Sequence, residues 1–226
     1  ALAFLALGVF SYAQTPLPDP RASAEAAPEA PYQKKLSDSS SIKFAEYTLV
    51  PLATFDAKGL ILSLKKYPQK PDEHRSLLSP LDIAIGWGPM SNPSILQNFR
   101  YYQDDRFFFY ACYQSYASEA ERFGAGSHVA NIHIIPANTN IAQALKNIQP
   151  RDIVRLRGQL VAVKLQNQTI WQSSLSRSDE GDGACELLYL TRLEWFTDPL
   201  KGIDFPAPID PPVNPQAEPT TYRKGK

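Results

Sequence analysis

The segment RDIVRLRGQLVAVKL, residues 151–165, limits the possible folds more than any other stretch of the chain. Its apolar and polar residues alternate on both sides of Gly158, and a period of two is typical of a β-strand with one buried face. A glycine inside such a strand indicates a kink or a bulge, which allows a small sheet to turn a corner. The segment therefore predicts a strongly bent sheet, such as a small closed or partly closed barrel.

Other β-type segments occur along most of the chain, at residues 42–50, 58–67, 79–88, 105–116, 128–136, 169–175 and 184–196. One helix, IAQALKNI, is predicted after Pro136, where Asn138 or Thr139 can cap its first turn. A second short helix is predicted around residues 94–99. We therefore expect an α+β fold dominated by antiparallel β-structure, an OB-like barrel with one or two short helices.

The first ten residues form a continuous apolar run, and Ser11-Tyr12-Ala13 places small residues at the −3 and −1 positions of a cleavage site. This pattern is typical of a secretory signal peptide that is truncated at its start, so residues 1–13 predict export to the periplasm or the medium. The alternative is an uncleaved anchor, but spanning needs about 20 apolar residues and a proline already follows at Pro16. We expect no stable membrane insertion after cleavage.

Composition divides the rest of the chain into three parts. Residues 14–41 are rich in Pro, Ala, Ser and charge, so they predict a flexible linker. Residues 199–226 are rich in proline and predict an extended tail, either unstructured or lying along the domain through Phe205 and Ile209. A single globular β-rich domain of residues 42–198 remains between them.

Export gives the two cysteines a default role. The chain has two cysteines, Cys112 and Cys185, and an even number of cysteines in an oxidising compartment predicts a disulfide between them. Closing a loop of about 70 residues would stabilise the fold by about 4 kcal/mol on the chain-entropy model. Two free, buried thiols are the alternative.

The stretch WQSSLSRSDEGDGACELLYL, residues 171–190, concentrates side chains that could bind a ligand. Its acids, including Asp179 and Asp182, miss the spacing of an EF-type calcium loop, and the histidines of the chain lack metal-ligand spacing. We therefore predict no metal and no cofactor, while a calcium loop of another type stays open. Arg177 beside Asp179 indicates either an ion pair that holds the loop or an anion-binding group.

Nucleophilic catalysis has little support in the sequence, because no Gly-x-Ser-x-Gly motif occurs. A serine of the run at 173–176 would need His128 or His133 from elsewhere in the fold as its base. For a ligand-binding role His133 is the better of the two histidines, because its strand ends at a proline beside a loop. Trp87 lies between two glycines, where it either packs in the core or offers a platform for sugar rings or peptide. The candidate binding residues are Trp87, His133, Arg177, Asp179 and Asp182.

Charge argues against a nucleic-acid partner. Basic and acidic residues number 23 each, whereas a phosphate-binding domain normally carries a basic excess. A local basic face would need the side chains of Arg151, Arg155, Arg157 and Lys164.

Four motifs, SPLDIAIGWGPMS, NIHIIPAN, DIVRLRGQLV and SSLSRSDEGDGACE, together resemble a family of exported bacterial proteins of uncharacterised activity. The resemblance covers residues 44–195, and it implies export and a single domain but no catalytic residues. A non-enzymatic module that binds an envelope protein or glycan through Trp87, His133 and the 177–182 loop is our leading hypothesis. The alternative is an extracytoplasmic hydrolase in which His133 acts with a residue of the 173–186 loop.

Overall fold

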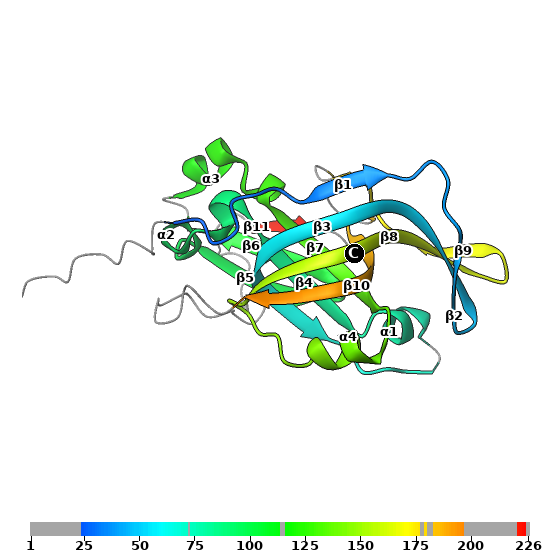
Figure 1. The fold of residues 1–226 in the computed structure, drawn as a ribbon. Helices are drawn as coiled ribbons and strands as arrows, with labels where there is room; N and C mark the ends of the chain where they lie inside the picture. Colours follow the sequence, from blue (N-terminus) through cyan, green and yellow to red (C-terminus); the bar gives the residue numbers. More distant parts are fainter. Residues whose placement is uncertain are drawn as a thin grey trace, which may run out of the picture.

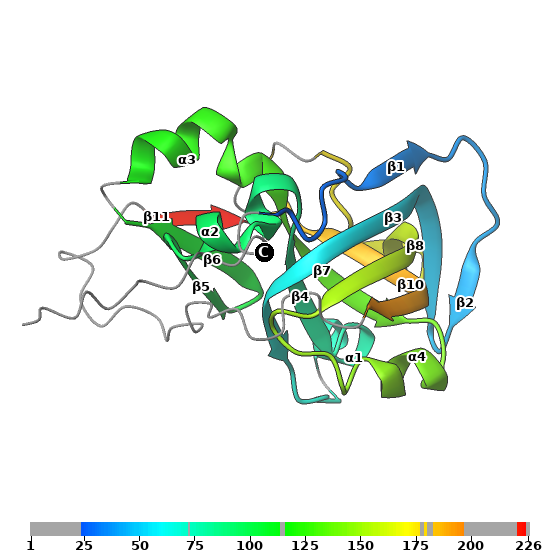
Figure 2. The ribbon, with the colours of Figure 1, turned by 60° about the vertical axis from the view of Figure 1, so that its left-hand side comes forward.

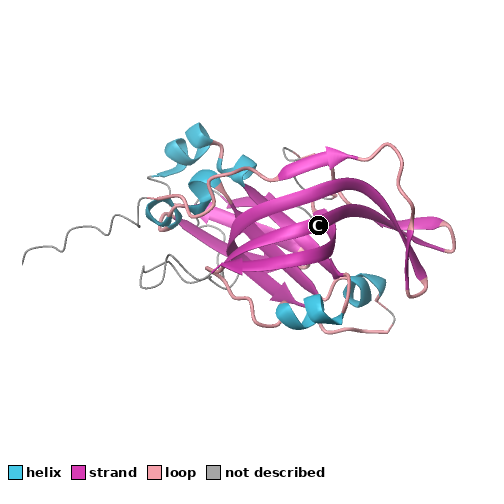
Figure 3. Cartoon of the chain, viewed as in Figure 1, coloured by secondary structure: helices cyan, strands magenta, loops and turns pink. Residues whose placement is uncertain are grey.

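The computed structural model describes residues 24–71, 73–113, 116–176, 179, 183–196 and 221–224, so the predicted signal peptide lies outside the described residues. A curled, mostly antiparallel sheet and a smaller sheet make up most of the structure, with short helices around them (Figures 1 and 3). The predicted α+β class dominated by antiparallel β-structure is confirmed.

The large sheet contains eight strands: β1 (Tyr32–Lys35), β2 (Ile42–Phe44), β3 (Tyr47–Lys66), β4 (Leu81–Gly86), β7 (Val129–Pro136), β8 (Ile153–Leu165), β9 (Gln168–Gln172) and β10 (Glu186–Phe196). The small sheet contains β5 (Phe99–Asp104), β6 (Phe107–Cys112) and β11 (Thr221–Lys224). The helices are α1 (His74–Leu78), α2 (Pro93–Leu96), α3 (Ala117–Phe123) and α4 (Thr139–Ala144), with 3₁₀ turns η2 (Gly88–Ser91) and η4 (Ala125–His128).

Five strands of the large sheet are linked by a circuit of pairings. β3 pairs with β4, β4 with β7, β7 with β10 and β10 with β8, and β8 pairs again with the long, bent β3. The β7–β10 pair is parallel, and the other four are antiparallel. The result is a partly curled sheet rather than a closed barrel (Figure 2). Its OB-like type stays a prediction.

Gly158 lies in the middle of β8, where the backbone of β10 comes close to this strand. A Cβ atom at Gly158 would lie 2.0 Å from the carbonyl oxygen of Tyr189, so only glycine fits there. The register of the β8–β10 pair shifts between Leu190 and Arg192, directly opposite. The irregularity predicted at Gly158 therefore exists, but the extra residue, Thr191, belongs to the partner strand.

Both faces of the β4–β7 pair are covered. Ile83 and Ile132 belong to the buried cluster that also contains Leu156 of β8 and Leu188 of β10. Ala84, the neighbour of Ile83 on β4, instead packs with the aromatic residues of the small sheet. Because side chains alternate along a strand, Asp82, Asn131 and His133 share the face of Ala84, which the small sheet covers.

The N-terminal boundary of the domain differs from the prediction, because residues 24–41 belong to the fold. β1 pairs with β3, and Ala27 is fully buried. The Ala27 N–H donates to the Ser91 hydroxyl, and its carbonyl accepts from the Gly88 N–H. A segment with few large apolar groups is ordered here by backbone hydrogen bonds, which its composition does not indicate.

The end of the C-terminal segment, for which an unstructured tail and a tail lying along the domain were both considered, pairs with the small sheet. β11 pairs antiparallel with β6, with Thr221 opposite Ala111 and Lys224 opposite Phe108. Residues 199–220, including Phe205 and Ile209, lie outside the described residues. The basic end of the chain therefore adds a strand to the small sheet (Figure 2).

Candidate functional site

The candidate site begins at the turn of the β5–β6 hairpin. Asp105 and Arg106 occupy the turn and have φ values of 40° and 68°, as the two-residue type I′ turn requires. Left-handed backbone costs a non-glycine residue about 1–2 kcal/mol, so a compensating interaction is expected. The Arg106 side chain supplies it, because it is only 3% exposed and lies over the β4–β7 pair.

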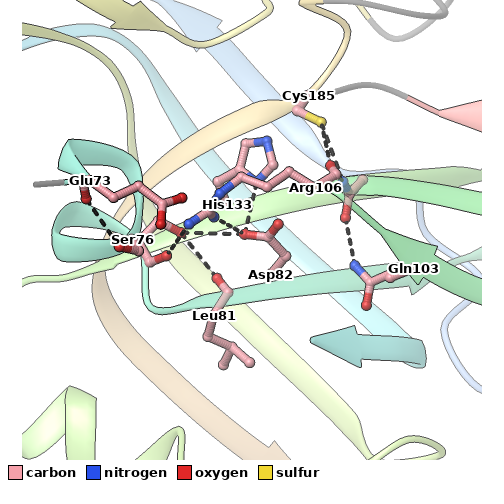
Figure 4. Close-up of polar contacts among 10 residues, drawn as sticks. Glu73, Ser76, Leu81, Asp82, Gln103, Arg106, His133 and Cys185 are labelled. Atoms are coloured by element: carbon pink, nitrogen blue, oxygen red, sulfur yellow. Dashed lines mark hydrogen bonds and ion pairs between the residues drawn. The ribbon is translucent and has the colours of Figure 1, made fainter. Parts of the chain in front are cut away.

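Asp82 of β4 is the centre of a buried polar cluster. Its Oδ1 accepts a hydrogen bond from Arg106 Nη1 at 2.9 Å and lies 2.8 Å from Nδ1 of His133. Arg106 Nη2 donates to the carbonyl of Ser79 at 3.0 Å. Figure 4 shows Arg106 and His133 converging on the Asp82 carboxylate. Burying three such groups is tolerable because the charges of Arg106 and Asp82 compensate each other.

A second layer of hydrogen bonds holds the hairpin turn in place. Asn131 Nδ2 donates to the Arg106 carbonyl at 2.8 Å and to Cys185 Sγ at 3.3 Å. Gln103 Nε2 donates to Asn131 Oδ1 at 2.9 Å. The turn is therefore fixed to the sheet through both the backbone and the side chain of Arg106.

Two aromatic rings cover the cluster. The Arg106 guanidinium lies 3.9 Å from the ring centroid of Tyr67 and 5.5 Å from that of Trp171. The Trp171 ring lies 4.9 Å from the His133 ring. Burial and the nearby Asp82 carboxylate raise the pKa of the Tyr67 hydroxyl well above its usual value. His133 is fully buried, and its Nε2 has no hydrogen-bond partner among the described residues.

Two pockets lie beside this cluster. The larger, of about 500 Å³, is lined by Lys65, Tyr67, Pro68, Lys70, Asp104, Asp105 and Arg106. The smaller, of about 240 Å³, is lined by His74, Leu78, Ile170 and Trp171. Because Glu73 and Arg75 line both pockets, we treat the two as one site and call it the Tyr67–Trp171 groove.

Most charges in the Tyr67–Trp171 groove are paired. Lys65 lies 3.1 Å from Asp104, and Lys70 lies 3.9 Å from Glu73. Arg75 differs, since its guanidinium lies 5.4 Å from the Trp171 ring centroid and contacts no carboxylate within the described part of the chain. Of the four basic residues that line the groove, Arg75 is therefore the one whose meeting with a ligand would break no ion pair among the described residues.

Of the predicted binding residues that the structure describes, His133 alone lies in this cluster, and it is buried. Trp87 is 3% exposed and packs in the barrel core, so its ring faces no solvent. Asp179 accepts a hydrogen bond from the Ser174 hydroxyl at 2.5 Å. Arg177 and Asp182 lie outside the described residues.

The central residues of the cluster, Asp82 and Arg106, are absent from the sequence-based prediction. Asp82 carries a usable signal, because it is an acid inside the otherwise apolar run SPLDIAIG, and buried acids almost always have a partner. Arg106 carries none, since it follows two aspartates at the start of the predicted β-type segment 105–116.

The structure also corrects the predicted disulfide, because Cys112 and Cys185 are free, buried thiols. Cys185 contacts the Arg106 carbonyl just before β6 begins, whereas Cys112 is the last residue of β6. At about 3.3 Å per residue the two ends of β6 are about 17 Å apart, and a disulfide needs Cα atoms within about 7 Å. The prediction considered the compartment and not the separation along this strand.

Thiol titration tests this correction directly. In the native protein, burial should protect both Cys112 and Cys185 from an alkylating reagent, and burial also raises the pKa of the Cys112 thiol. After unfolding without reductant, both thiols should react, and the intact mass should increase by two adducts. A chain that is lighter by two hydrogens and does not react would contradict the structure.

The basic face considered for nucleic acid includes arginines that are already paired. Arg155 donates two hydrogen bonds to Asp56, at 2.7 and 2.8 Å, and Arg157 contacts both Asp56 and Glu194. These hydrogen bonds, that of Arg155 above all, lower the pKa of Asp56. Much of the positive charge at this face is therefore locally neutralised.

Comparison of the chain with protein-family models, curated proteins and solved structures found no match. In the described part of the chain, no helix has the length and apolar character needed to cross a membrane. The same residues contain no group of three or more His, Cys, Asp or Glu side chains placed to hold a metal ion.

Proposed function

We propose that the protein is an exported, non-catalytic binding module that holds a glycan of the cell envelope in the Tyr67–Trp171 groove. The observation that carries the proposal is that Glu73 and Arg75 line both pockets, beside a buried polar cluster. Polar side chains on a rigid support can recognise a hydroxyl-rich ligand with little ordering cost.

The position of the groove supports a binding role if the barrel is of the OB type. In that interpretation, residues 67–80 connect the first two barrel strands, β3 and β4, and Trp171 lies in the connection between β8 and β10. OB-type barrels bind oligosaccharides and oligonucleotides with these two loops and the neighbouring strand face. Both pockets of the groove are lined from the first connection, and one of them also from the second.

Charge favours a glycan over a polyanion. The groove is lined by four basic residues, Lys65, Lys70, Arg75 and Arg106, and by three acids, Glu73, Asp104 and Asp105. When Asp82, which pairs with Arg106, is included, the numbers of basic and acidic residues are equal. A nucleic acid would require a basic excess, whereas a neutral or weakly charged sugar chain needs closely spaced donors and acceptors.

No specific observation among the described residues supports the alternative that the protein is a hydrolase. His133 is fully buried beneath Trp171, and the Ser173 hydroxyl accepts from the Leu187 N–H and donates to the Ser174 carbonyl. A general base must be within hydrogen-bond reach of the proton it removes, and a buried imidazole has no access to a substrate. We therefore do not propose catalysis.

Titration with a β-1,4-linked N-acetylglucosamine tetramer, followed by NMR of the backbone amides, tests the proposal. We expect saturable shifts in residues 67–75 and around Trp171. Replacing Arg75 with Ala or Glu73 with Gln should weaken binding about 10-fold, or about 1.4 kcal/mol. Arg122→Ala, at an exposed site on α3, is the matched control and should leave binding unchanged. Absence of saturable shifts in the millimolar range, or shifts confined to another face, would exclude this function.

A further inference from the structure

A separate pocket lies between α4 and the start of β4, and we call it the α4 pocket. Its volume is about 410 Å³, which is the size of a small-molecule site. Most of its wall is apolar and comes from Pro80, Leu81, Pro136, Ala142 and Leu145. Tyr67 lines both this pocket and the Tyr67–Trp171 groove, but the two sites otherwise share no lining residue.

The charges of the α4 pocket have one sign. Lys66 and Lys146 line it, and no acidic residue does. The Lys66 ammonium donates to the Lys146 carbonyl at 3.3 Å, so it lies at the end of α4 beside the second lysine. Neither lysine is paired with a carboxylate anywhere in the described residues. An apolar cavity with an unneutralised basic rim is thus present, in contrast to the balanced charges of the groove.

We propose that the α4 pocket binds one molecule of a single-chain amphiphile with an anionic head group, such as a fatty acid. The carboxylate would meet Lys66 and Lys146, and the chain would lie against Leu81 and Leu145. Each buried methylene contributes about 0.8 kcal/mol, so a chain of moderate length gives useful affinity even when only part of it is enclosed. The occupant is a monomer rather than a membrane surface, because the apolar area is recessed between α4 and the sheet.

Titration with dodecanoate below its micelle concentration tests this inference. We expect saturable amide shifts in residues 139–146 and at Leu81, and dodecyltrimethylammonium should bind at least about 10-fold more weakly because its charge opposes the lysines. Lys66→Gln and Lys146→Gln should each weaken dodecanoate binding about 3- to 10-fold. Lys35→Gln, an exposed lysine on β1, is the control and should change nothing.

Ala142→Phe provides an independent variant, because it fills the pocket without altering either lysine. It should abolish dodecanoate binding while the far-ultraviolet circular dichroism spectrum and the binding of the N-acetylglucosamine tetramer stay unchanged. The proposal fails if dodecanoate gives no saturable shifts, if the cationic detergent binds equally well, or if the lysine variants bind as the wild type does. It also fails if the protein sediments with phosphatidylglycerol vesicles but does not bind the monomer.

Discussion

Replacing Arg106 with alanine is expected to lower the free energy of unfolding by about 3–5 kcal/mol. The substitution removes the guanidinium that donates to Asp82 at 2.9 Å and leaves that carboxylate fully buried without its cation. It also removes the donor to the Ser79 carbonyl. Urea denaturation followed by circular dichroism measures the loss.

Two further variants distinguish the contribution of the Asp82–Arg106 ion pair to stability from that of side-chain packing. The double variant Asp82→Asn with Arg106→Met removes both charges, so it should be more stable than Arg106→Ala alone. Arg122→Ala breaks an exposed ion pair on α3 and should change stability by no more than about 0.5 kcal/mol. A loss below about 1 kcal/mol for Arg106→Ala would show that the cluster contributes little to the fold.

Gly158→Ala is expected to destabilise the protein by about 3 kcal/mol or more, or to prevent folding. The added Cβ would lie 2.0 Å from the Tyr189 carbonyl oxygen and 3.0 Å from its carbonyl carbon. Both atoms belong to the backbone of β10, which cannot move away without breaking its pairing with β8. For a chain of this length the loss corresponds to a decrease in melting temperature of roughly 6–12 °C.

Gly183→Ala is the matched control for this substitution. Gly183 has a φ of 85°, but nothing lies within 4 Å of the position that a Cβ would occupy. Alanine there should therefore cost only the conformational penalty of about 1–2 kcal/mol. Equal melting temperatures for the two variants would mean that close approach of β8 and β10 is not what selects glycine at position 158.

The sequence predicts several local elements, because their periodicity depends only on neighbouring residues, but it divides the single long strand β3 and misses α3. The alternation in 151–165 corresponds to β8, and Asn138 caps α4 by accepting from the Ile141 N–H. The order in which the strands pair is not predictable in this way, since no local pattern indicates that β7 lies parallel to β10. The same limit applies to β1, whose residues resemble a linker until β3 supplies a partner.

The candidate site is less predictable for the same reason. Asp82, Arg106 and His133 come from β4, a hairpin turn and β7, and only the strand order brings them together. His133 is identifiable from sequence as a histidine on a strand, but its burial is not. The composition of residues 171–190 indicates a ligand-binding loop. The residue of this stretch that contacts the cluster is Trp171, whose ring packs against His133, and composition does not predict that contact.

The circuit of strand pairings also sets how the chain can reach this fold. β3 and β8 pair over twelve positions, and the Asp56–Arg155 contact across them joins residues 99 apart in the sequence. Contacts at such separations must be formed against a large loop-closure entropy, so the protein belongs with the slow folders of milliseconds to seconds. Until β8 pairs with it, the side of β3 that faces β8 is an exposed strand edge, although β1 and β2 can already pair along its other side. Such an edge can pair with other chains, so rapid dilution from denaturant at high protein concentration should favour aggregation over refolding.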